Sequence, residues 1–154
     1  ILPMGRIENI PSFTALLGIE KTPVILANVR REEKELILSL GRQQFFKQEN
    51  IFFITDFTNT QEAEIEDMFA DEFFLDLVRS SGIPVESPEL IEDSRILELF
   101  EQQRNFDTLK PALKFMKEQH LLLPKLESIT LNRFEDMFIK INESAPIDCN
   151  LVGW

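Results

Sequence analysis

The chain has 154 residues, of which 44% are hydrophobic, so it can bury one good core but is too short for two comfortable domains. Its net charge of −11 argues against a self-sufficient nucleic-acid binder, whose affinity comes from lysines and arginines that neutralise phosphates. A single histidine and a single cysteine argue against a zinc site, a Ser-His-Asp triad and an internal disulfide framework.

Two features bear on the chain's location and extent. No apolar run approaches the ~20 residues needed to span a bilayer, and nothing resembles a signal peptide, so we expect a cytoplasmic protein without a membrane partner. The lone thiol of Cys149 fits a reducing compartment. Because Ile1 stands inside the apolar stretch ILPM, we expect the chain to begin partway through a larger protein.

The first half alternates short apolar runs with helix-like segments. The runs ILPM (1–4), VILANV (24–29) and IFFIT (51–55) are typical of buried strands. A helix is expected from Pro11 to Gly18, and another over 31–44 with Leu36, Ile37 and Leu40 on one face. This order predicts right-handed crossovers and a parallel sheet covered by helices, with functional groups at the carboxyl ends of the strands.

The second half is predicted to be helical. Residues 70–81 carry four apolar positions on one face and end before Gly82, and residues 108–119 follow Asp107 as a cap, with Pro111 in the first turn. A third helix is expected over 131–142, capped by Thr130. The predicted core positions of the first and third helices are Phe73, Phe74, Leu77 and Val78, and Phe134, Met137, Phe138 and Ile141.

Four carboxylates follow the third predicted strand, in the stretch DFTNTQEAEIEDMF (56–69): Glu62, Glu64, Glu66 and Asp67. They fit the start of a helix, where carboxylates are favoured by about 0.3–1 kcal/mol each. They also fit a Mg²⁺ or Mn²⁺ site, because hard cations prefer carboxylate oxygens. If the segment is extended, Glu64 and Glu66 point the same way and Asp67 the other.

Three stretches together, ILPMGRIENIPSFTALLG, TDFTNTQEAEIEDMF and ITLNRFEDMFIKIN, resemble the carboxy-terminal TOPRIM region of OLD-family (overcoming lysogenization defect) ATP-dependent nucleases. The match covers most of residues 1–142 in order and spacing. The resemblance implies a TOPRIM fold and metal-dependent DNA cleavage with Mg²⁺ or Mn²⁺, driven by an ATPase domain earlier in the chain, often in antiphage defence. It makes Glu64, Glu66 and Asp67 the candidate metal ligands and Lys110 the candidate catalytic lysine.

The chain departs from the family pattern at one acidic element. The family's Asp-x-Asp pair falls on Ala27 and Val29, which flank Asn28 and supply no oxygen to a cation. The family's upstream glutamate would lie before Ile1. We therefore expect weak Mg²⁺ binding and poor DNA cleavage, unless Glu32 or Glu33 substitutes through a loop shift.

These observations predict a three-layer α/β domain, with a TOPRIM-like parallel-sheet core over 1–82, a helical extension over 83–144 packed on it, and a tail over 145–154. The leading hypothesis is a metal-site-degenerate module of an OLD-family ATPase that acts on DNA in antiphage defence or repair. Its role would be structural or regulatory, through dimerisation or partner binding. An active Mg²⁺- or Mn²⁺-dependent endonuclease and an acidic protein–protein interaction domain remain open. If the site is degenerate, no cofactor is expected.

Overall fold

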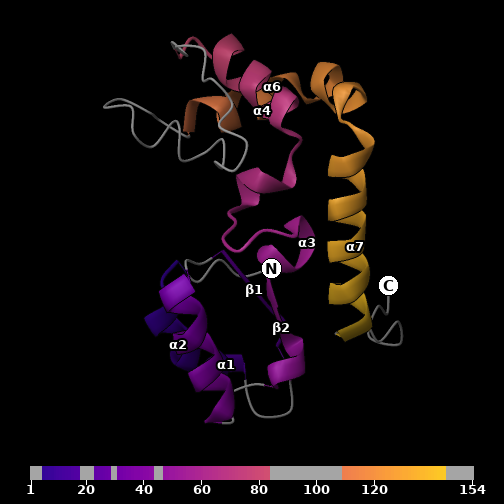
Figure 1. Ribbon diagram of the computed structural model, residues 1–154. Helices are drawn as coiled ribbons and strands as arrows, with labels where there is room; N and C mark the ends of the chain where they lie inside the picture. Colours follow the sequence, from indigo (N-terminus) through magenta and orange to yellow (C-terminus); the bar gives the residue numbers. More distant parts are fainter. Residues whose placement is uncertain (1–4, 18–22, 29–30, 44–46, 84–108, 145–154) are drawn as a thin grey trace, which may run out of the picture. The chain divides into compact units, whose positions relative to one another are not determined.

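The computed structural model describes residues 5–17, 23–28, 31–43, 47–83 and 109–144 (Figure 1). The chain divides into two compact units, the first formed by residues 1–64 and 135–154 and the second by residues 65–134. The predicted strand over 1–4, the Asp107 cap and the predicted tail lie outside the described residues. The predicted division at residue 82 stays a prediction.

The first unit is built on two short parallel strands. Strand β1 (Ile25–Ala27) pairs with β2 (Ile51–Phe53), and Ile25 lies opposite Ile51. Helix α2 (Arg31–Arg42) and the 3₁₀ turn η2 (Gln48–Asn50) connect them, which confirms the predicted strand–helix–strand order in this part of the chain. A small parallel sheet flanked by helices is an α/β arrangement, although most of the described residues are helical.

One face of this sheet carries the core of the unit. Alternate strand residues point to the same face, so Ile25, Ala27, Ile51 and Phe53 are buried together. Two helices pack there, α1 (Ile10–Leu17), which follows the turn η1 (Ile7–Asn9), and α2, through the buried residues Ile10 and Ile37.

The packing of α2 corrects part of its predicted core face. Ile37 is fully buried and Leu40 half-buried, but Leu36 is 46% exposed. The contact stripe of α2 is narrow and centred on Ile37, so the residue before it turns to solvent.

The other face of the sheet is covered near its carboxyl end. Helix α3 (Thr55–Thr58) follows β2 directly, and the rings of Phe52 and Phe57 lie 6.4 Å apart. The Lys140 ammonium lies 4.9 Å from the centre of the Phe57 ring. Asn59 ends α3 with a left-handed backbone (φ 58°), a conformation that asparagine tolerates better than most residues.

The second unit is helical. It contains the 3₁₀ turn η3 (Ile65–Met68), helix α4 (Asp71–Ser80), helix α6 (Leu109–Leu122), the turn η4 (Leu123–Lys125) and the first residues of α7 (Ser128–Ser144). The four predicted core residues of α4 are all buried, which confirms that pattern: Phe73, Phe74, Leu77 and Val78. Gly82, at φ 78°, follows the end of α4 as predicted, and its N–H donates to the Arg79 carbonyl at 3.1 Å.

Aromatic rings join the helices of this unit. Phe69 lies within 5.4–5.9 Å, centre to centre, of Phe73, Phe115 and Phe134. Most of these contacts are edge-to-face, a favourable geometry for aromatic quadrupoles. The phenylalanine content therefore serves packing here.

Two predictions for α7 are wrong. The helix begins at Ser128, with the Leu131 N–H donating to the Glu127 carbonyl, so Thr130 lies inside the helix and is not its cap. The Thr130 hydroxyl is instead fully buried and accepts the N–H of Ala70 at 2.8 Å. Phe138, predicted as core, is 55% exposed, whereas Met137 is buried and Phe134 and Ile141 are half-buried. None of the helices in the described part of the chain is long and apolar enough to cross a bilayer.

Candidate functional site

The carboxyl end of the strand pair is the place where the sequence predicts chemistry. Ala27 lies opposite Phe53, and the Ile54 N–H donates to the Ala27 carbonyl at 3.3 Å. Both strands therefore end at the same level, and the residues that leave them, Asn28 and Thr55, come from the same edge of the sheet.

The residues at the end of β1, where the resemblance leads us to look for an Asp-x-Asp pair, offer little to a cation. The Ala27 methyl group is packed in the core with Ile37 and is 7% exposed. Asn28 is exposed, and Val29 lies outside the described residues. An amide oxygen is a weaker ligand for a hard cation than a pair of carboxylates, since it carries no charge.

A lysine occupies this edge, and the sequence interpretation missed it. Lys34, in the first turns of α2, places its Nζ 3.3 Å from the Thr55 hydroxyl and 4.5 Å from the centre of the Phe53 ring. The ring and the hydroxyl hold a half-buried ammonium at the carboxyl end of β2. The signal in the sequence was the position of Lys34, about one turn into the helix that follows β1.

The carboxylate nearest to β2 in the sequence, Asp56, has a local structural role. Its Oδ2 accepts the backbone N–H of Phe53 at 2.8 Å, across the turn from β2 into α3. This bond uses one carboxylate oxygen to hold the strand end in place. Asp56 as a whole remains exposed.

The acidic cluster adopts neither of the two backbone forms considered for it. Residues 65–68 form the 3₁₀ turn η3, which is neither an extended strand nor the start of a long helix. Glu62, Glu64, Glu66 and Asp67 are all half-buried. Glu64 ends the first unit, whereas Glu66 and Asp67 belong to the second.

The described residues contain no group of three or more acidic, histidine or cysteine side chains arranged to hold a metal ion. The assignment of Glu64, Glu66 and Asp67 as metal ligands stays a prediction.

The backbone that follows the cluster is held by helix α7. Arg133 donates from Nη1 to the carbonyls of Asp67 (2.9 Å) and Phe69 (3.4 Å), and Thr130 accepts the Ala70 N–H one turn earlier on the same helix. The bond to Thr130 satisfies a buried amide just before α4 begins. The end of the acidic segment is therefore anchored through its backbone to the first turns of α7.

The first residue of α4 has a perturbed carboxyl group. Partial burial raises the pKa of Asp71 above its ordinary value of 3.8, the Arg133 guanidinium opposes that rise, and the Asp67 carboxylate adds to it. Because Asp71 remains open to water, the consequence for the free energy of unfolding is small.

The predicted catalytic lysine lies in the second unit. Lys110 is the second residue of α6, is exposed, and precedes the buried Pro111. This position is that of a first-turn lysine in contact with solvent. The strand ends belong to the first unit, and the role of Lys110 stays a prediction.

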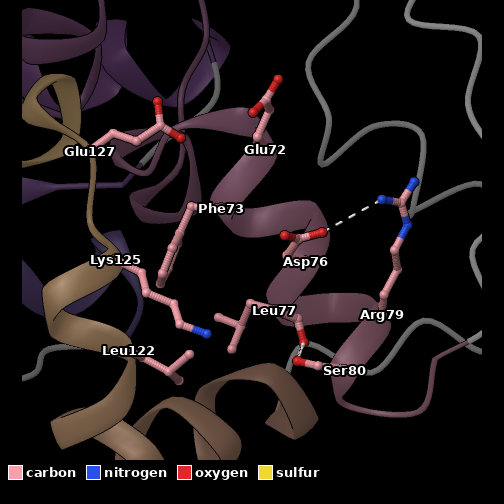
Figure 2. Close-up of a pocket in the computed structure, with 9 residues that line it drawn as sticks. All are labelled: Glu72, Phe73, Asp76, Leu77, Arg79, Ser80, Leu122, Lys125 and Glu127. Atoms are coloured by element: carbon pink, nitrogen blue, oxygen red, sulfur yellow. Dashed lines mark hydrogen bonds and ion pairs between the residues drawn. The ribbon is translucent and has the colours of Figure 1, made fainter.

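A hollow of about 590 Å³ lies beside α4 in the second unit (Figure 2). Its apolar wall is made by Phe73, Leu77 and Leu122, and its rim carries charges of both signs, among them Lys125 and Glu127. Figure 2 shows the Asp76–Arg79 ion pair (3.6 Å) on the rim, where exposure to water makes it weak. The one hydroxyl among its lining residues, that of Ser80, donates to the Leu77 carbonyl at 3.0 Å.

No family model, no curated protein and no solved structure matches this chain.

Proposed function

We propose that this chain is a TOPRIM-like module of an OLD-family ATPase that acts on DNA, and that it has lost the metal site needed for cleavage. Its role is structural or regulatory, exerted on the ATPase domain that precedes it, in antiphage defence or DNA repair. The resemblance of the three stretches supports the family assignment, and the parallel strand pair is compatible with it.

The observation that carries the proposed loss of cleavage is Lys34. Two-metal cleavage of DNA needs carboxylates that hold two cations about 3.5–4 Å apart. Here the carboxyl end of the strands carries the Lys34 ammonium and the uncharged Asn28 amide, while the Ala27 methyl group is buried. The Asp56 carboxylate at the end of β2 uses one oxygen to accept the Phe53 N–H. The Lys34 ammonium repels a divalent cation, which opposes metal binding at this edge.

The test is supercoiled-plasmid nicking with Mn²⁺, using the full parent protein. The proposal predicts no nicking above that of a Glu66→Ala variant, and no saturable low-micromolar Mn²⁺ binding by calorimetry. Glu72→Ala is a matched control, because Glu72 is an exposed acidic residue on α4 away from the cluster.

Two results would favour the active-nuclease alternative and overturn the proposal. The first is Mn²⁺-dependent nicking by the wild type that disappears in Glu66→Ala but persists in Glu72→Ala. The second is tight Mn²⁺ binding with the same dependence on Glu66.

A further inference from the structure

One side of helix α6 presents an exposed apolar surface. Leu109, Leu113 and Met116 are 60%, 43% and 69% exposed. They recur at i, i+4 and i+7, so they form one stripe along the helix. We call these three residues the α6 stripe.

The α6 stripe is separate from the face that α6 uses for folding. Pro111 and Leu122 are buried, and Phe115 packs edge-to-face on Phe69 and Phe73. At 100° per residue Pro111 and Phe115 lie on the opposite side of the helix from the stripe. Among the described residues, the core of the second unit is therefore built on the other face of α6.

Lysines border the stripe on one side. Lys110 and Lys117 are exposed, and helical spacing places both beside the stripe. Lys114, farther round, is committed to an ion pair with Glu118 at 2.9 Å. Residues 109–122 carry three lysines and one glutamate, so this helix is locally basic on a chain whose net charge is −11.

The stripe ends near a break in the helix. Glu118 has non-helical backbone angles (φ −111°, ψ 18°), so the regular 3.6-residue spacing holds only up to that point. About two turns of regular helix therefore present the stripe, enough for one short amphipathic helix to lie along it.

We propose that the α6 stripe and its lysine border form a docking surface for an acidic amphipathic helix of a partner protein. Apolar side chains of that helix cover Leu109, Leu113 and Met116, while its carboxylates face Lys110 and Lys117. A second copy of α6 is a poor occupant, because paired stripes would bring lysines of like charge together. This inference rests on the proposed structural or regulatory role. It names the class of partner protein through which that role would be exerted.

The test uses the full chain and a fluorescent synthetic peptide as the probe. The peptide is an amphipathic helix of roughly four turns, with leucines at i, i+4, i+7 and i+11 flanked by glutamates. A companion peptide carries lysines in place of the glutamates. Anisotropy should show saturable binding of the acidic peptide and at least about tenfold weaker binding of the basic one.

Variants assign the binding to α6. Leu113→Glu should weaken it at least about tenfold, and Lys110→Glu with Lys117→Glu should weaken it severalfold and reduce its salt dependence. Leu131→Glu, at a residue 51% exposed on α7, is the matched control and should leave binding unchanged. Circular dichroism checks that each variant keeps its helix content.

Three results of the peptide assay would overturn this inference. They are no binding of the acidic peptide by the wild type, equal binding of both peptides, and an equal loss in Leu113→Glu and Leu131→Glu. A concentration-dependent dimer that dissociates in Leu113→Glu would also overturn it, because a second copy would then be the occupant. Plasmid nicking, which tests the proposed function, can succeed or fail independently of these measurements.

Discussion

Helices α4 and α6 belong to the same compact unit and share a core, yet they use their apolar residues in opposite ways. All five large apolar residues of α4 are buried, in clusters on two sides of the helix. In α6 the leucines Leu109, Leu113 and Leu121 and the methionine Met116 are exposed. Apolar content alone therefore does not identify a core helix, because what counts is whether another element covers the face.

The largest expected difference between the two helices comes from a matched pair of leucine truncations. Leu77→Ala on α4 should lower the free energy of unfolding by about 2–5 kcal/mol, since Leu77 is 5% exposed and the substitution leaves a cavity. Leu113→Ala on α6 should change it by less than about 0.5 kcal/mol. Urea denaturation of both variants measures the difference, and equal losses would mean that the α6 stripe is covered.

The start of α4 offers a second, smaller effect. Thr130→Val keeps the shape of the side chain but removes the oxygen that accepts the buried Ala70 N–H, so we expect a loss of about 1–3 kcal/mol. Thr14→Val is the matched control. The Thr14 hydroxyl only donates to the Ile10 carbonyl of its own helix, so that change should cost less than about 0.5 kcal/mol. A loss in Thr130→Val no larger than the control's would show that this bond does not hold the entry to α4.

The smallest expected effect is a titration at the first turn of α4. NMR of side-chain carboxyl carbons should place the pKa of Asp71 above 3.8, and Asp67→Asn should lower it, because the neighbouring carboxylate raises it. The folded state then holds this proton more tightly than the unfolded chain. The contribution of Asp71 to the free energy of unfolding is therefore lost as the pH rises from 3.8 through the folded pKa. A higher Asp71 pKa in Asp67→Asn would contradict this account.

Local patterns in the sequence were enough for several elements of the fold. The apolar runs around Ile25 and Ile51 and the helical spacing from Phe73 to Val78 predicted β1, β2 and α4, and the glycine after α4 marked its end. These elements are set by side-chain periodicity and by one left-handed residue, both of which are local properties. The lack of carboxylates at Ala27, Asn28 and Val29 is likewise readable from the residues alone.

Other features could not be predicted from local patterns, because they depend on contacts between residues far apart in the chain. Thr130 looks like a helix cap until a buried amide 60 positions away takes its hydroxyl. Lys34 is an ordinary helix lysine until the ring of Phe53 and the hydroxyl of Thr55 fix it at the strand ends. Phe138 has the spacing of a core residue, yet it remains 55% exposed in the fold. The residue pattern determines which faces can be buried, and the assembled fold determines which of them are.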